Sequence, residues 1–317
     1  MRIKRAIPHF CSLLGLLGGL APAWAGATPA EDLVRQGEYI FRLGGCQGCH
    51  TDSANQGAPL AGGRALETPF GTFYTPNITP DPIHGIGKWS EYDFVHAITQ
   101  GMGSAAGQGI ASGTGHYFPV FPYPAYTHIS RGDLHALWIY LRTVPPAAHT
   151  NKRHDTAWYL LPGASWAWQL LFFKHGADPG QAAQPEQSAA QRGEYIAKAL
   201  AHCEECHTPR TRFGTLDQGL SYAGTQQGPE GAVVPNITPD PKTGIGQWAQ
   251  ADLLDFFKDG GLPNGDYTGG LMAEVIDNGL KYLTREDAEA LATYIRNLPP
   301  IEHAVSRKKK TAASPKP

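Results

Sequence analysis

The sequence predicts a mostly α-helical protein made of two tandem domains with long loops. Three blocks of sequence occur twice in the same order, and apolar residues in the outer blocks recur at helical spacing. A content of 38 glycines and 26 prolines among 317 residues leaves much of the chain outside regular elements. Hydrophobic residues at 41% and charged residues at 17% are ordinary for a globular protein with a core.

The repeated blocks set the expected domain boundaries. The first pair begins RQGEYI and QRGEYI, the second pair shares NITPDP, and both members of the third pair end in twin prolines. The matched stretches are residues 35–51 with 191–208, 76–89 with 235–248, and 129–146 with 283–300. We therefore expect one domain over residues 30–150 and a second over residues 186–302.

Each domain is expected to begin with a helix. In the first domain Val34, Tyr39 and Ile40 form an apolar stripe just ahead of a cysteine pair, as in a short amphipathic helix. Gly37 and its counterpart Gly193 stand where such a helix could cross another at close range, although loop flexibility is the alternative explanation for both.

A second helix is expected at the end of each domain. Ser130 with Asp133, and Thr284 with Asp287, match a capping box that has Asp in place of Glu. Apolar residues then follow at helical spacing, and the twin prolines end the helix. The possible packing partners for the two glycines are Tyr140 and Tyr294.

The first 25 residues are typical of a secretory signal peptide. A positive start precedes an apolar run from Phe10 to Leu20 and the small-x-small site Ala23-Trp24-Ala25. The run is too short to span a bilayer, and an uncleaved anchor is the alternative. We therefore expect residues 1–25 to be removed and the mature protein to be periplasmic.

The four cysteines beyond this segment all lie in two CxxCH motifs. Two thiols three positions apart can add to the two vinyl groups of a porphyrin, and the next residue can then offer its imidazole to the iron. Zinc would need cysteine pairs closer in sequence, and a thioredoxin-like motif gives the histidine no role. The motifs therefore predict two covalently bound haem c groups. The attachment residues are Cys46, Cys49, Cys203 and Cys206, and the iron ligands beside them are His50 and His207.

Residues 151–185 combine an aromatic segment, His154 to Gly176, with a polar linker that follows it. We call the aromatic segment the strap. The strap could be an exposed patch for a partner protein or a membrane. Because large aromatic side chains are more often buried, we expect it instead to pack between the domains and cover one haem edge.

The charges indicate the kind of partner. The whole chain carries a formal charge of −2, and the part between its basic ends is more acidic. Such a surface suits docking on a basic patch of a redox partner and argues against nucleic acid. The basic tail over residues 303–317 is expected to be disordered, with peripheral membrane contact as the alternative.

Four stretches give the chain its family resemblance: NITPDP, GIG followed closely by a tryptophan, HCEECHTPR and FPVFPYPAY. With them the chain resembles the haem subunits of membrane-bound alcohol and gluconate dehydrogenases, and the dihaem cytochromes c of periplasmic molybdenum hydroxylases. The resemblance implies two class I cytochrome c-like domains. Those subunits often have a third haem domain and a membrane-binding tail, whereas this sequence ends after its second haem motif and domain. The chain is therefore expected to be a soluble two-haem relative.

The resemblance also bears on the distal ligand of each iron. Met272 occupies the place where the family has its distal methionine, and core packing is its alternative role. In the first domain Phe121 stands at that place and cannot bind iron. His116, on a glycine-rich loop, is then the expected ligand, Met102 the second candidate, and an open site the third.

The expected function is electron transfer, from a periplasmic dehydrogenase to a terminal oxidase or another cytochrome. The alternative is a dihaem enzyme, a peroxidase or a sulfur-compound dehydrogenase, with a catalytic first haem. Electron transfer is favoured because no cysteine is left to ligate a catalytic haem, and the repeats lack the peroxidase pattern.

Overall fold

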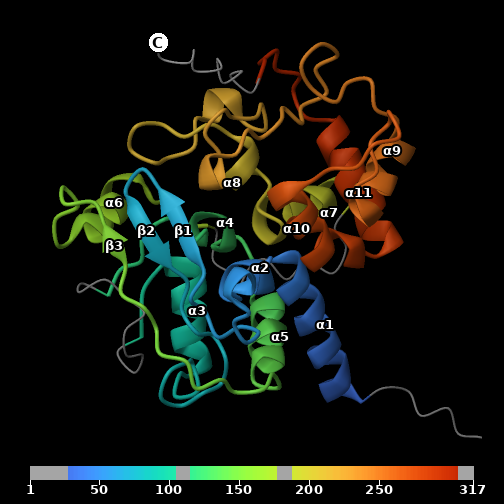
Figure 1. The fold of residues 1–317 in the computed structure, drawn as a ribbon. Coiled ribbons are helices and arrows are strands. Elements are labelled where there is room, and N and C mark those ends of the chain that lie inside the picture. The colour runs from blue at the N-terminus through green and yellow to red at the C-terminus, as the bar shows by residue number, and fades with distance from the viewer. Residues whose placement is uncertain (1–27, 105–114, 177–187, 306–317) are drawn as a thin grey trace, which may run out of the picture.

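The computed structural model describes residues 28–104, 115–176 and 188–305, and in these ranges helices dominate, as expected (Figure 1). The expected signal peptide, the end of the linker and the tail beyond residue 305 lie outside the described residues. The α-helices are α1 (Pro29–Leu43), α2 (Cys46–His50), α3 (Glu91–Gln100), α4 (Tyr123–Tyr126), α5 (Arg131–Leu141), α6 (Ala164–Phe172), α7 (Ala189–Tyr195), α8 (Glu204–His207), α9 (Gln250–Asp259), α10 (Gly270–Asn278) and α11 (Arg285–Arg296). Among the described helices, none has the length and apolar character needed to cross a membrane.

Helices α1 and α5 cross closely at Gly37. A capping box between Thr28 and Glu31 begins α1 and satisfies its first backbone donors. A Cβ added at Gly37 would lie 2.0 Å from the carbonyl oxygen of Ala136 and 2.6 Å from Cβ of Tyr140. The close crossing predicted from the sequence is therefore confirmed, and it requires glycine.

The same arrangement recurs between α7 and α11 in the second half of the chain. A Cβ added at Gly193 would lie 2.1 Å from the carbonyl oxygen of Ala290 and 2.8 Å from Cβ of Tyr294. Helix α7 continues through a π-helical turn, Ile196–Leu200, to the second cysteine pair. In both halves a glycine thus lets the helix ahead of the cysteines pack against the last helix.

The N-caps of α5 and α11 correct one sequence prediction. The side chain of Ser130 accepts a hydrogen bond from the amide of Asp133 at 3.1 Å, and that of Thr284 accepts one from Asp287 at 3.2 Å. The expected return bonds, which the backbone amides of Ser130 and Thr284 would donate to the two carboxylates, are not among the described contacts. The capping boxes are therefore only half formed, because both carboxylates bind residues elsewhere.

Those carboxylates accept hydrogen bonds from tyrosines in the opposite half of the chain. Tyr39 in α1 donates to Asp287 in α11 at 2.6 Å, and Tyr195 in α7 donates to Asp133 in α5 at 2.6 Å. Arg192 adds two hydrogen bonds to Asp287, at 2.7 and 2.6 Å. Both tyrosines come from the repeated block GEYI. Each half thus donates its tyrosine to the aspartate of the other half, and we call this pair of hydrogen bonds the reciprocal contact.

This contact predicts acid sensitivity. Burial alone would raise the pKa of Asp287, but hydrogen bonds from Arg192 and Tyr39 outweigh it and hold the pKa below its ordinary value. A lowered carboxyl pKa stabilises the fold above the pKa of the unfolded chain, and this stability is lost as the pH falls through the lower folded pKa. Asp287→Asn should therefore cost about 1–3 kcal/mol at neutral pH and flatten the loss of stability below about pH 4.

Urea unfolding at several pH values would test this expectation. The matched control is Asp277→Asn, because Asp277 is 72% exposed in its ion pair with Lys281. Such a surface pair contributes about 0–1 kcal/mol. Equal losses in the two variants would contradict the expected role of the reciprocal contact.

A small antiparallel sheet ties the strap to the first half. Strand β1 (Ala65–Thr68) pairs with β2 (Gly71–Tyr74), which also pairs with β3 (Asp155–Thr156), so the strand order is β1-β2-β3. The hydroxyl of Tyr159 also donates to the carbonyl oxygen of Pro69 at 2.6 Å. The strap therefore begins on the surface of the first half.

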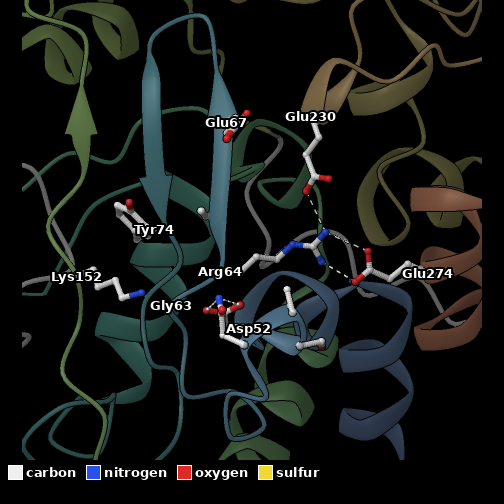
Figure 2. Close-up of a pocket in the computed structure, with 12 residues that line it drawn as sticks. Asp52, Gly63, Arg64, Glu67, Tyr74, Lys152, Glu230 and Glu274 are labelled. Atoms are coloured by element: carbon white, nitrogen blue, oxygen red, sulfur yellow. Dashed lines mark hydrogen bonds and ion pairs between the residues drawn. The ribbon is translucent and has the colours of Figure 1, made fainter.

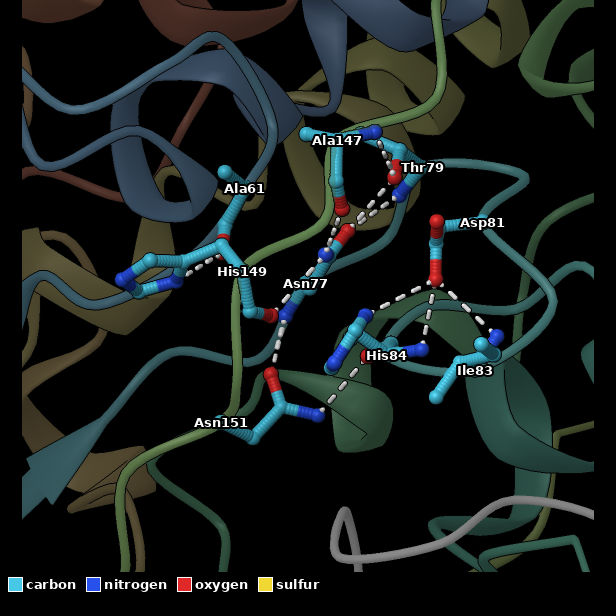
Figure 3. Close-up of polar contacts among 9 residues, drawn as sticks. All are labelled: Ala61, Asn77, Thr79, Asp81, Ile83, His84, Ala147, His149 and Asn151. Atoms are coloured by element: carbon cyan, nitrogen blue, oxygen red, sulfur yellow. Dashed lines mark hydrogen bonds and ion pairs between the residues drawn. The ribbon is translucent and has the colours of Figure 1, made fainter.

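The NITPDP motif holds the loop that precedes α3 (Figure 3). The side-chain amide of Asn77 donates to the carbonyl oxygens of Ala147 and His149, at 2.7 and 3.2 Å. Its side-chain oxygen accepts from the amide and hydroxyl of Thr79 at 2.9 and 2.7 Å. Since Asn77 is fully buried, this loop is fixed to the chain after α5, and with it the carbonyl group of the preceding residue, Pro76.

Candidate haem sites

The first CxxCH motif forms the short helix α2. Gly45 precedes it with a φ of +64°, a left-handed conformation that suits glycine. Cys46 is half-buried against the core, whereas Cys49 is exposed. Both thiols are unpaired, and burial raises the pKa of Cys46 to about 12. The motif thus presents two protonated thiols from a single helical turn.

The second motif, around α8, has the same form. Cys203 and Cys206 are half-buried and unpaired, and burial raises their pKa values to about 12 and about 11. His202 precedes the motif with a φ of +38°, so a histidine takes the left-handed position that glycine takes in the first motif. Such a conformation is uncommon outside glycine and is held by the surrounding packing.

Each motif histidine is oriented by the loop behind it. Nδ1 of His50 lies 2.7 Å from the carbonyl oxygen of Pro76, and Nδ1 of His207 lies 2.9 Å from that of Pro235. Because a carbonyl only accepts, Nδ1 carries the proton in both rings, and Nε2 is left as the nitrogen that could bind iron. Burial lowers the pKa of both histidines, although these hydrogen bonds oppose the shift, so the neutral form that metals require is favoured.

Four buried polar atoms in the first half have no hydrogen-bond partner among the described residues: those of the Thr75, Trp89, Tyr117 and Tyr123 side chains. The indole nitrogen of Trp89 can only donate, and the hydroxyl groups can donate as well. Buried polar groups are normally satisfied, so these atoms indicate an absent acceptor, and haem propionates are acceptors of a suitable kind. Together with the thiols and neutral imidazoles, they show that the residues present fit haem c.

The structure brings the two motifs close together. The hydroxyl of Tyr126 donates to the carbonyl oxygen of Gly44 at 2.6 Å, and its ring meets that of His202 edge-on at 5.4 Å between centroids. Nε2 of His202 would lie 3.9 Å from a Cβ added at Gly45. The residues just before the two cysteine pairs therefore lie side by side. Sequence reasoning missed His202, since nothing in the pattern shows which surface it meets.

An arginine clasp holds α10 against α2 (Figure 2). Nη1 of Arg64 donates to the carbonyl oxygen of Gly48 and to Glu274, both at 2.6 Å, and Nη2 donates to Glu230 at 3.0 Å. These bonds to two carboxylates raise the pKa of Arg64, although burial opposes the shift. The clasp was also missed, because its members lie far apart in sequence.

The positions of Met272 and Phe121 correspond in the two halves. The amide of Tyr117 bonds to the carbonyl of Gly101 at 2.7 Å, and that of Thr268 bonds to Gly260 at 2.9 Å. Phe121 follows Tyr117 by four residues, as Met272 follows Thr268. Both side chains are half-buried against the core. The local backbone differs, since Met272 lies in α10 whereas Phe121 lies in the bend before α4, so the assignment of Met272 as an iron ligand stays a prediction.

His116 lies on a different part of the same loop. Its Nδ1 is 2.5 Å from the side-chain oxygen of Gln169 in α6. The side-chain nitrogen of Gln169 donates to the carbonyl oxygen of Gly101 at 2.9 Å. Met102 pairs with His116 across an isolated β-bridge and is 40% exposed. The structure thus ties His116 to the strap, and its assignment as an iron ligand stays a prediction.

Similar proteins carry names that match this chemistry. The chain is 37% identical over 283 residues to a dihaem cytochrome c-type protein of Cereibacter sphaeroides, covering 84% of this chain and 86% of that protein. It is 35% identical over 303 residues to the cytochrome c subunit of a quinone alcohol dehydrogenase from Komagataeibacter europaeus, and equally to that of gluconate 2-dehydrogenase from Pantoea cypripedii. Those matches cover 90% of this chain but only 60% and 65% of the relatives. No protein-family model matches the chain.

Proposed function

We propose that this chain transfers electrons through two covalent haem c groups. It belongs to the family of dihaem c-type cytochromes and dehydrogenase cytochrome c subunits, as its relatives show. Its electron donor would be a dehydrogenase, as the relatives' names suggest, and its acceptor a terminal oxidase or another cytochrome. We place the mature protein in the periplasm, since its first 25 residues have the pattern of a signal peptide. Its acidic surface suits a basic redox partner.

The paired histidine geometry carries this proposal. The same Nδ1–carbonyl contact orients His50 and His207, each directly after two unpaired thiols. Haem supplies an iron that takes up and releases one electron. The cysteines would hold it, and the oriented imidazoles would bind its iron from one side. Two such constellations support two tandem class I domains, over residues 30–150 and 186–302.

Mass spectrometry of the denatured holoprotein should find two haems retained on the chain. Cys203→Ser with Cys206→Ser should leave one haem, because thioether bonds survive denaturation whereas ligation to iron does not. The matched double variant is Cys46→Ser with Cys49→Ser. A wild-type mass equal to that of the bare polypeptide would refute covalent attachment.

The first iron offers a test between electron transfer and the enzymatic alternative. If His116 is its distal ligand, that haem has the lower potential, so electrons would enter there and leave at the second haem. His116→Ala should then shift one potential in a spectroscopic redox titration and add a high-spin signal.

Gln169→Ala is the control, because it removes the hydrogen-bond partner of His116 and keeps the imidazole. If His116→Ala leaves both potentials and the low-spin signals unchanged, His116 is not the ligand. Rapid carbon monoxide binding by the wild type would then support a dihaem enzyme with an open first haem.

A further inference from the structure

Helix α6 has its polar residues inside and its apolar residues outside. On the inner side Ser165 is 1% exposed and Gln169 bonds to the first half. On the outer side Trp166 is 50%, Leu170 69% and Leu171 70% exposed. A surface helix normally has the opposite arrangement, because water favours polar side chains. The outer face of α6 therefore has the composition of a covered surface.

The apolar face extends beyond the helix. In the turn before α6, Trp158 is 91% and Leu161 72% exposed. From the second half, the half-exposed ring of Phe213 stacks on Phe172 with centroids 5.5 Å apart. We call these residues the α6 patch: Trp158, Leu161, Trp166, Leu170, Leu171, Phe172 and Phe213. Large apolar side chains that gather exposed in one segment of a protein surface are typical of an interaction site. This result corrects the expectation that the strap is buried. Trp168 and Phe173 are partly buried against the core, whereas the α6 patch is exposed.

Basic residues flank the α6 patch in sequence. Residues 157–173 contain no charged side chain. Arg153 lies exposed before this stretch and Lys174 lies exposed after it. The guanidinium of Arg212 lies over the ring of Phe213, whereas Asp155 is the acidic residue nearest in sequence. The residues that flank the α6 patch are therefore more basic than acidic, on a chain whose net charge is negative.

We propose that the α6 patch binds the interfacial region of an anionic lipid membrane, with α6 lying in the plane of the surface. Exposed fractions from 69% to 91% mean that Trp158, Leu161 and the paired leucines project outward, whereas the main contacts of protein interfaces fill pockets. Leucine tips beside tryptophan and basic residues are the composition of in-plane membrane helices. Figure 1 shows α6 at an edge of the molecule, where a flat membrane could reach it.

The charges and the apolar side chains have separate roles in this binding. The basic residues would attract anionic headgroups, and each contributes a modest, salt-sensitive part. The leucines and tryptophans would enter the boundary between headgroups and acyl chains, where burial of apolar area gives a part that salt does not weaken. Both parts together are needed for binding to last.

Vesicle flotation of the purified, haem-loaded chain tests the proposal. The wild type should float with vesicles of phosphatidylethanolamine and phosphatidylglycerol, and much less with phosphatidylcholine alone. Leu170→Gln with Leu171→Gln should lower partitioning at least about tenfold. The matched control is Ile83→Gln with Tyr92→Gln, since those side chains are 69% and 65% exposed outside the α6 patch. Arg153→Glu with Lys174→Glu should weaken binding to the anionic vesicles alone.

Haem absorbance and circular dichroism of each variant would establish that it is folded. Failure of the wild type to float with anionic vesicles would overturn the proposal, as would equal losses in the leucine pair and its control. Light scattering gives one more outcome that would overturn the proposal. If the wild type forms a dimer and does not bind vesicles, and if the leucine variant is a monomer, the α6 patch binds a second copy of the chain. A blue shift of tryptophan emission on adding vesicles, lost in Trp158→Phe with Trp166→Phe, would support insertion.

Discussion

Met272→Ala is expected to lower the potential of one haem by roughly 0.1 V or more, because a methionine sulfur raises the potential of the iron that it binds. The sulfur-to-iron charge-transfer band should disappear at the same time. The other haem should stay nearly unchanged, since Phe121, at the expected distal position of the first half, offers no sulfur. A spectroscopic redox titration measures both effects.

Met102→Ala is the matched control for this experiment, because Met102 is 40% exposed and lies on the loop of His116. It should leave the charge-transfer band and both potentials in place. If Met272→Ala gave an unchanged spectrum and titration, its sulfur would have only a packing role. A band lost in Met102→Ala instead would assign the sulfur ligand to the first haem.

Gly193→Ala is expected to destabilise the fold by about 3 kcal/mol or more, since the new methyl group would overlap the backbone of α11. Its Cβ would lie 2.1 Å from the carbonyl oxygen of Ala290, and the backbone has no alternative rotamer. The helices must move apart, which also disturbs the turn that leads to Cys203. Thermal and urea unfolding of the haem-loaded variant would measure the loss.

Gly132→Ala is the control for this second experiment. Gly132 lies in the first turn of α5, and nothing lies within 4 Å of a Cβ added there. Alanine should leave stability unchanged or raise it by up to about 1 kcal/mol, because it favours the helix. Equal destabilisation by both substitutions would mean that the close crossing is not the cause.

Local features were the ones that could be predicted from the sequence. The helix start at Ser130 and the close approach at Gly37 depend on residue types and spacings within a few positions of one another. The positions of the cysteine pairs also follow from a local motif. The predicted return bonds of Asp133 and Asp287 were wrong because tyrosines from the other half compete for the carboxylates.

Features that join distant parts of the chain could not be predicted. Arg64 meets Glu274 across 210 positions, and Tyr39 meets Asp287 across 248. Charged and phenolic side chains of this kind are usually solvated, so their types alone do not select a partner. The exposure of Trp158 was missed because large aromatic side chains are usually buried. The sequence does not show whether another part of the same chain covers them.

The reciprocal tyrosine contact has an evolutionary consequence. A surface that meets its own copy in this way is the signature of a twofold dimer, so the proposed tandem domains resemble two subunits fused into one gene. In a homodimer every substitution appears in both subunits. A single gene is free of that constraint, and the two halves differ where Gln36 donates to Asp133 and Arg192 donates to Asp287. They also differ at Phe121 and Met272. One polypeptide could thus hold the two unequal redox centres proposed above, which a symmetric homodimer could not.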